Sequence, residues 1–107
     1  MASTPEGKIQ LEIMKYLRKQ GFLFWRFSPE TYKARLGIHV KSEWVPNGLP
    51  DICLIDKEQY GQLVGLEVKT AKGKPSPAQL LMQRRFHLAN ARYEFVRSVE
   101  DVKKLGF

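Results

Sequence analysis

Two short charged motifs in the middle of the chain carry residue types that could do chemistry. Gly48-Leu49-Pro50-Asp51 leads into an apolar run, and Glu67-Val68-Lys69 follows after a polar turn. If the hairpin between them folds symmetrically about Gln59, Asp51 lies directly across from Glu67, with the two Cβ atoms about 5 Å apart. Carboxylates this close repel each other unless a cation or a proton intervenes, and oxygen ligands of this kind suit Mg²⁺ or Mn²⁺. The pattern therefore predicts a divalent-metal site.

A lysine stands beside the second acidic residue. The period of two along a strand places Glu67 and Lys69 on one face. A lysine there could orient or help deprotonate a water, or stabilise the charge that develops on a phosphorane-like transition state. The backbone carbonyl of Val68 lies between them and could be a further ligand. Two alternatives stay open: a tighter turn at Tyr60-Gly61 would spoil the carboxylate pairing, and the charged residues could form an ion-pair cluster on an exposed strand face.

Two more residues are candidates for the same site. On a helical wheel, Glu6 heads the stripe that a first helix would bury, so its carboxyl group needs a partner. Gln79 lies in the first turn of a helix that follows the second strand of the hairpin, and it could reach the same end of the sheet. Gln79 also occupies the position where a capping box places Glu or Gln, and the two roles are compatible.

The elements that must position these residues follow from periodicity, caps and turns. Gly61 is expected at positive φ in the hairpin turn, and the segment Ser28 to Asn47 has no clear periodicity. The expected helices are Pro5 to Gln20, Ser76 to about Asn90 and Ser98 to Leu105, and the expected strands are Phe22 to Phe27, Asp51 to Asp56, Gln62 to Thr70 and Tyr93 to Arg97. The order α-β-β-β-α-β-α predicts an α/β fold, with a mixed β-sheet flanked by helices.

Composition narrows the class of protein. A chain of 107 residues with 43% hydrophobic content is expected to form one domain over residues 1–107. The net charge of +7 favours a polyanionic partner such as nucleic acid, although a merely solvated basic surface is the alternative. The single cysteine, Cys53, excludes an intramolecular disulfide and fits an intracellular setting, and no apolar run is long enough to span a membrane.

Basic residues lie in the two loops that flank the expected metal site. Contacts of such residues with phosphates would position a nucleic acid without reading its sequence. The candidates are Lys33, Arg35, Lys41, Lys72 and Lys74.

Taken together, the motifs resemble the VRR-NUC branch of the PD-(D/E)xK nuclease superfamily, in its standalone phage and bacterial form. The resemblance extends from Glu6 to Val102, and one departure is Asn90-Ala91, where relatives often have a glycine turn. It is carried by Glu6 with Ile9-Gln10, Gly48-x-Pro50-Asp51, Glu67-x-Lys69, Gly73-Lys74-x-Ser76-x-x-Gln79 and Val96-Arg97-Ser98-Val99-Glu100-Asp101-Val102.

The resemblance implies a restriction-endonuclease-like core and a set of site roles. It implies that Asp51, Glu67 and the Val68 carbonyl bind Mg²⁺ or Mn²⁺, that Glu6 contributes through water, and that Lys69 is catalytic with support from Gln79. Standalone members are similar to Holliday junction resolvases and tend to be homodimers. A bacterial cytoplasm, or that of a phage-infected host, is the expected location.

The leading hypothesis is thus a metal-dependent DNA endonuclease that hydrolyses phosphodiester bonds and selects branched DNA such as Holliday junctions. One alternative is a nucleic-acid-binding module that has kept the fold and lost the reaction. The other is a flap or single-strand nuclease.

Overall fold

The predicted order of helices and strands is the one observed. The computed structural model describes residues 4–27 and 44–107. The bounds of the helices and strands differ from the expected ones by at most two residues. The elements are α1 (Pro5–Gln20), β1 (Leu23–Arg26), β2 (Ile52–Asp56), the short 3₁₀ helix η1 (Lys57–Gln59), β3 (Gln62–Val68), α3 (Pro77–Leu88), β4 (Arg92–Val96) and α4 (Val99–Lys104).

The four strands form one mixed sheet, as predicted. Their spatial order is β1-β2-β3-β4. The pairs β1–β2 and β2–β3 are antiparallel, and β4 runs parallel to β3. A parallel neighbour requires a crossover, and α3 provides it between β3 and β4.

The hairpin between β2 and β3 has the expected register. Its pairs run from Asp56 with Gln62 to Ile52 with Leu66, so the turn is centred on Gln59. Gly61 has a φ of 81°, which confirms the prediction of positive φ, and Tyr60 before it also lies in the left-handed region. The longer turn, which includes η1, excludes the tight two-residue turn that would have shifted the register.

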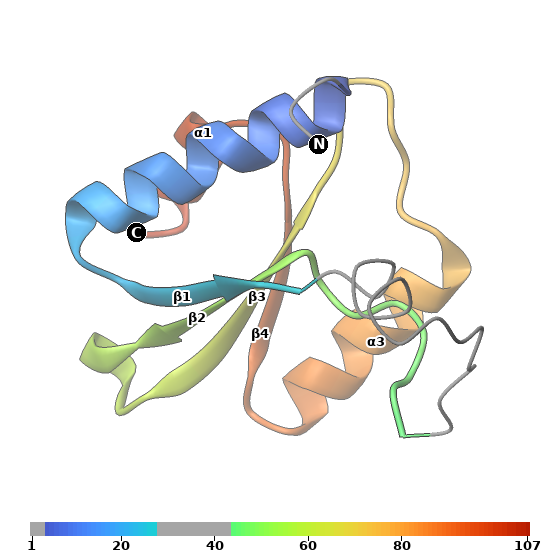
Figure 1. Cartoon of the computed structure of the whole chain (residues 1–107). Helices are drawn as coiled ribbons and strands as arrows, with labels where there is room; N and C mark the ends of the chain where they lie inside the picture. The colour runs from blue at the N-terminus through green and yellow to red at the C-terminus, as the bar shows by residue number, and fades with distance from the viewer. Residues whose placement is uncertain (1–3, 28–43) are drawn as a thin grey trace.

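Helices cover both faces of this sheet (Figure 1). On one face, α1 contributes Ile13 and Leu17 to a fully buried core, together with Leu54 of β2 and Val102 of α4. On the other face, Phe86 of α3 packs edge-on against Tyr93 of β4, with ring centroids 5.2 Å apart. Tyr93 and the core residue Val96 are three positions apart on β4, so they point to opposite faces.

Both ends of α1 are capped. The Thr4 hydroxyl accepts a hydrogen bond from the Gly7 N–H at the start of α1, and Gly21 ends that helix at a φ of 82°. After α3, Asn90 adopts a φ of 64°. Asparagine tolerates this left-handed conformation, so it can make this turn without a glycine.

No helix in residues 4–27 and 44–107 is long and apolar enough to cross a membrane. Of the predicted phosphate contacts, Lys33, Arg35 and Lys41 lie outside the described residues.

Candidate metal centre

The hairpin register brings the two predicted carboxylates together. Asp51 directly precedes β2, and continuing the β2–β3 ladder by one pair sets it opposite Glu67 of β3. The Val68 N–H donates a hydrogen bond of 3.0 Å to Asp51 Oδ2, which fixes the side chain at the end of the sheet. The conditional prediction about the register is therefore confirmed.

A third carboxylate comes from the first turn of α1. One oxygen from each of Glu6, Asp51 and Glu67 lies within 4.8 Å of the others, a spacing at which the three could hold a metal ion. We call these three residues the acidic triad. Glu6 arrives here because the buried residues Gln10, Ile13 and Leu17 of α1 dock the helix on the sheet, with its first turn at the triad.

Lys69 completes the arrangement. Its Nζ lies 3.6 Å from Glu67 Oε2, and the two side chains are 13% and 4% exposed. The Lys69 N–H donates to the carbonyl of Val96 at 2.9 Å, so β4 fixes the backbone from which the ammonium group extends. The predicted placement of Glu67 and Lys69 on one face agrees with this geometry, and the ion pair is largely buried.

The electrostatics of the triad are unfavourable without a cation. Burial and the neighbouring Asp51 raise the pKa of Glu67 to about 8, although Lys69 opposes the rise. Burial also raises the pKa of Asp51, against the lowering effect of the Val68 N–H, and burial and Asp51 raise the pKa of Glu6. All three carboxyls thus resist sharing the site as anions. A divalent cation would relieve that repulsion, and an all-oxygen donor set fits Mg²⁺ or Mn²⁺.

The loop that precedes Asp51 packs closely against α3, β3 and β4, and its sequence did not predict these contacts. The Tyr93 hydroxyl donates to the Gly48 carbonyl at 2.8 Å. Gly48 has a φ of 83°, and a Cβ there would come 2.4 Å from the Ala78 carbonyl oxygen. A Cβ on Gly65 would come 2.4 Å from Pro50 Cγ. Only glycine fits at either position without local movement, so the loop approaches α3 and β3 more closely than other residues would allow.

Gln79 occupies the capping box. Its Oε1 accepts from the Ser76 N–H at 3.0 Å, while its own N–H donates to Ser76 Oγ at 3.2 Å. The side chain is therefore engaged at the start of α3 and is not a member of the acidic triad. The cap fixes the turn of α3 that carries Ala78, against which Gly48 packs.

The two predicted phosphate contacts that the structure describes lie outside the acidic triad. Lys72 and Lys74 are exposed in the segment that follows Lys69. Sequence reasoning missed Tyr93, and Arg97 entered it only as part of a family motif. No sequence pattern predicts these two contacts, because Tyr93 bonds to Gly48, 45 residues away, and Arg97 bonds to Thr70, 27 residues away.

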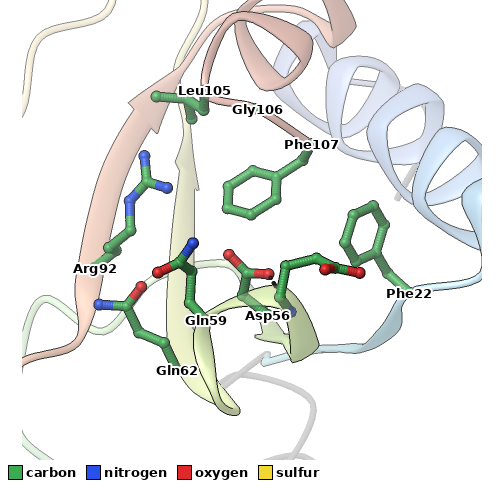
Figure 2. A pocket seen from close by; sticks show the side chains of 9 residues that line it. Phe22, Asp56, Gln59, Gln62, Arg92, Leu105, Gly106 and Phe107 are labelled. Carbon is green, nitrogen blue, oxygen red and sulfur yellow. Dashed lines mark hydrogen bonds between the residues drawn. The ribbon is translucent and has the colours of Figure 1, made fainter.

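A pocket of about 350 Å³ lies at the opposite end of the hairpin (Figure 2). Figure 2 shows Asp56, Gln62 and Arg92 around it, with the rings of Phe22 and Phe107. Asp56 and Gln62 form the pair next to the turn, whereas Asp51 lies beyond the other end of β2. The pocket is therefore separate from the acidic triad, and none of the three carboxylates lines it.

The mixed sheet between helices, with an acidic triad and a lysine at the strand ends, is consistent with a nuclease fold. A solved structure named "VRR_NUC domain" is 29% identical and superposes with a TM-score of 0.69, over 96% of this chain and 95% of that one. A second, "VRR_NUC domain protein", is 17% identical with a TM-score of 0.67, over 98% of this chain and 87% of that one, and it shows the fold alone.

The first likeness, over nearly the whole chain, supports a VRR-NUC domain and suggests a nuclease-family function. No family model matches the sequence, and no curated protein matches it.

Proposed function

We propose that this chain is a divalent-metal-dependent DNA endonuclease, one VRR-NUC-type domain over residues 1–107, which hydrolyses phosphodiester bonds with selectivity for branched DNA. The observation that carries the proposal is the convergence of Glu6, Asp51 and Glu67 within 4.8 Å, with the Lys69 ammonium 3.6 Å from Glu67. A merely structural ion pair between Glu67 and Lys69 would not need two further carboxylates beside it.

Each residue has a role that its surroundings support. Asp51 and Glu67 would hold Mg²⁺ or Mn²⁺, with the Val68 carbonyl as a further ligand and Glu6 acting through water. A bound ion of this kind would supply Lewis-acid polarisation of the phosphate and lower the pKa of a water. Lys69 would add positive charge next to the phosphate, in a setting where burial strengthens it.

DNA is the proposed partner because the molecule carries a net charge of +7, while three of its eleven acidic residues meet at the triad. Lys72 and Lys74, which follow the catalytic lysine, are proposed phosphate contacts, as are Lys33, Arg35 and Lys41. Gln79 would support the site by fixing the start of α3. An intracellular location remains part of the proposal.

We also propose a homodimer, since resolving a four-way junction requires two opposed cuts. Apolar side chains exposed on β1 and α3 support an interface between copies. They are Leu23, Trp25, Leu80, Leu81 and Leu88. Light scattering that gave a monomer mass with and without junction DNA would contradict this part.

Cleavage of labelled DNA tests the proposal. A four-way junction, a flap, a single strand and a linear duplex are each incubated with Mg²⁺, Mn²⁺ or a chelator. We expect metal-dependent cutting that is fastest on the junction, because the family resemblance points there. Preferential cutting of the flap or the single strand would instead support the alternative nuclease.

Substitutions at the site then separate an enzyme from a binding module. Asp51→Asn and Lys69→Ala are expected to abolish cutting and to retain DNA binding. Asp56→Asn and Lys57→Ala make the same charge changes at the turn end of the hairpin, and they are expected to cut normally. Full cleavage by Asp51→Asn would overturn the assignment. Binding without nicking in any metal would favour the inactive module.

A further inference from the structure

Arg97, the residue after β4, hydrogen-bonds to the turn 70–73, which follows the proposed catalytic residue Lys69. Its Nη1 donates to two carbonyl oxygens, those of Thr70 and Gly73, the second at 2.7 Å. Thr70 and Gly73 are the first and last residues of that turn, which the Gly73 N–H closes by donating to the Thr70 carbonyl at 3.1 Å. A single guanidinium nitrogen thus holds both ends of the segment 70–73.

The backbone of Arg97 is anchored to the start of α4. Its main-chain N–H donates to Asp101 Oδ2 at 2.9 Å, and the Asp101 main-chain N–H donates to Ser98 Oγ at 3.2 Å. Val102, the next residue of α4, is fully buried. The contacts therefore run from the core through Asp101 and Arg97 to the turn.

Among the residues that the structure describes, no other side chain hydrogen-bonds to the backbone of 70–73. The turn carries the exposed Lys72, and the exposed Lys74 comes directly after it. Within residues 4–27 and 44–107, the turn without Arg97 would keep only its internal hydrogen bond and its covalent links to Lys69 and Lys74. Exposed backbone with so few contacts samples many orientations.

We infer that Arg97 is a positioning residue for DNA: it sets the orientation of the turn 70–73, so that Lys72 and Lys74 meet the phosphates on either side of the bond held at the acidic triad. This inference rests on the proposed function. An arginine suits the role because its planar, delocalised head can donate to two acceptors at fixed angles, whereas a lysine is a flexible point charge.

The test compares Arg97→Met and Arg97→Lys with a matched control, Arg92→Met. Arg92 lies at the other end of β4, where it pairs with Glu94 at 3.1 Å, so its replacement removes the same charge away from the triad. Three measurements are made on the full chain: the rate of trypsin cleavage at the Lys72–Gly73 bond, the affinity for a labelled four-way junction in Ca²⁺, and the affinity for Mn²⁺ alone.

We expect Arg97→Met to speed trypsin cleavage and to weaken junction binding by about tenfold, the factor expected from one to two lost hydrogen bonds. Mn²⁺ affinity should stay unchanged, because the triad does not contact Arg97. Arg97→Lys should restore part of the protection and part of the affinity, and Arg92→Met should resemble the wild type in trypsin cleavage.

Two outcomes would overturn the inference. One is equal loss of junction affinity in Arg97→Met and Arg92→Met, which would reduce the role of Arg97 to net charge. The other is unchanged trypsin cleavage in both Arg97 variants. A wild-type protein that binds the junction and cuts no DNA would contradict the nuclease proposal alone, because the binding and trypsin comparisons would still decide the role of Arg97.

Discussion

Replacing Asp51 with asparagine is expected to stabilise the metal-free protein, even though the same change should abolish cleavage. Asp51 faces Glu67 across the hairpin, and burial together with Asp51 raises the pKa of Glu67 to about 8. Asparagine removes the charge of Asp51 and can still accept the hydrogen bond from the Val68 N–H. The proposed metal site thus opposes folding when no cation occupies it.

The magnitude follows from the separation of the charges. Two full charges 4.8 Å apart interact by about 3.5 kcal/mol at an effective dielectric constant of about 20. Burial is the larger cause of the Glu67 shift and persists in the variant, and protonation of Glu67 already relieves part of the repulsion at neutral pH. We therefore expect Asp51→Asn to raise the free energy of unfolding by about 1–2 kcal/mol near pH 7. Each kcal/mol corresponds to a rise of about 4–8 °C in melting temperature.

The pH dependence has a definite sign. Because the folded pKa of Glu67 lies above its ordinary value of 4.5, the folded state binds more protons than the unfolded state between about pH 4.5 and 8. The contribution of Glu67 to stability is therefore complete below pH 4.5 and declines as the pH rises to about 8. Asp51→Asn should flatten this decline, because it removes one of the causes of the shift.

The assay is urea or thermal unfolding in chelator at pH 5 to 9, with Asp56→Asn as the matched change at a buried aspartate outside the triad. Saturating Mn²⁺ should reverse the order, since ligand at about a hundred times its Kd stabilises only the binding-competent wild type, by about 2.7 kcal/mol. An Asp51→Asn variant that is no more stable than the wild type in chelator, with an unchanged pH slope, would refute the reasoning.

Two further predictions concern the packing around the triad. Gly65→Ala should lower the free energy of unfolding by about 1–3 kcal/mol and weaken cleavage, because the new Cβ would meet Pro50 Cγ at 2.4 Å directly before Asp51; a urea midpoint equal to that of the wild type would contradict it. Gln79→Ala and Ser76→Ala should each lower the free energy of unfolding by about 1 kcal/mol, because each removes part of the capping box. The two variants should also reduce cleavage equally. A much larger cleavage loss in Gln79→Ala would instead give Gln79 a direct role at the site.

The parts of the site that could be predicted lie within short stretches of sequence. The alternation of apolar residues and the length of the turn set the register of the hairpin, and the register alone places Asp51 opposite Glu67. The capping box of Ser76 and Gln79 marked the start of α3 for the same reason, because a cap involves residues only three positions apart.

Contacts between distant segments required the tertiary structure. Glu6 reaches the triad only because the buried face of α1 docks on the sheet, and helical periodicity indicated that it needed a partner without showing which. The bonds of Tyr93 with Gly48 and of Arg97 with the turn 70–73 join parts of the chain that are many residues apart.

The sequence by itself thus determined the order of elements, the hairpin register and the pair of carboxylates, since local backbone preferences and the two-residue period of a strand encode them. The sequence also indicated the capping role of Gln79, which the structure confirms. Only the tertiary structure placed the candidate Glu6 beside Asp51 and Glu67 and revealed the anchoring of the basic turn by Arg97. The physical reason is that such contacts depend on how whole elements pack, and no residue pattern within one element specifies the element it will meet.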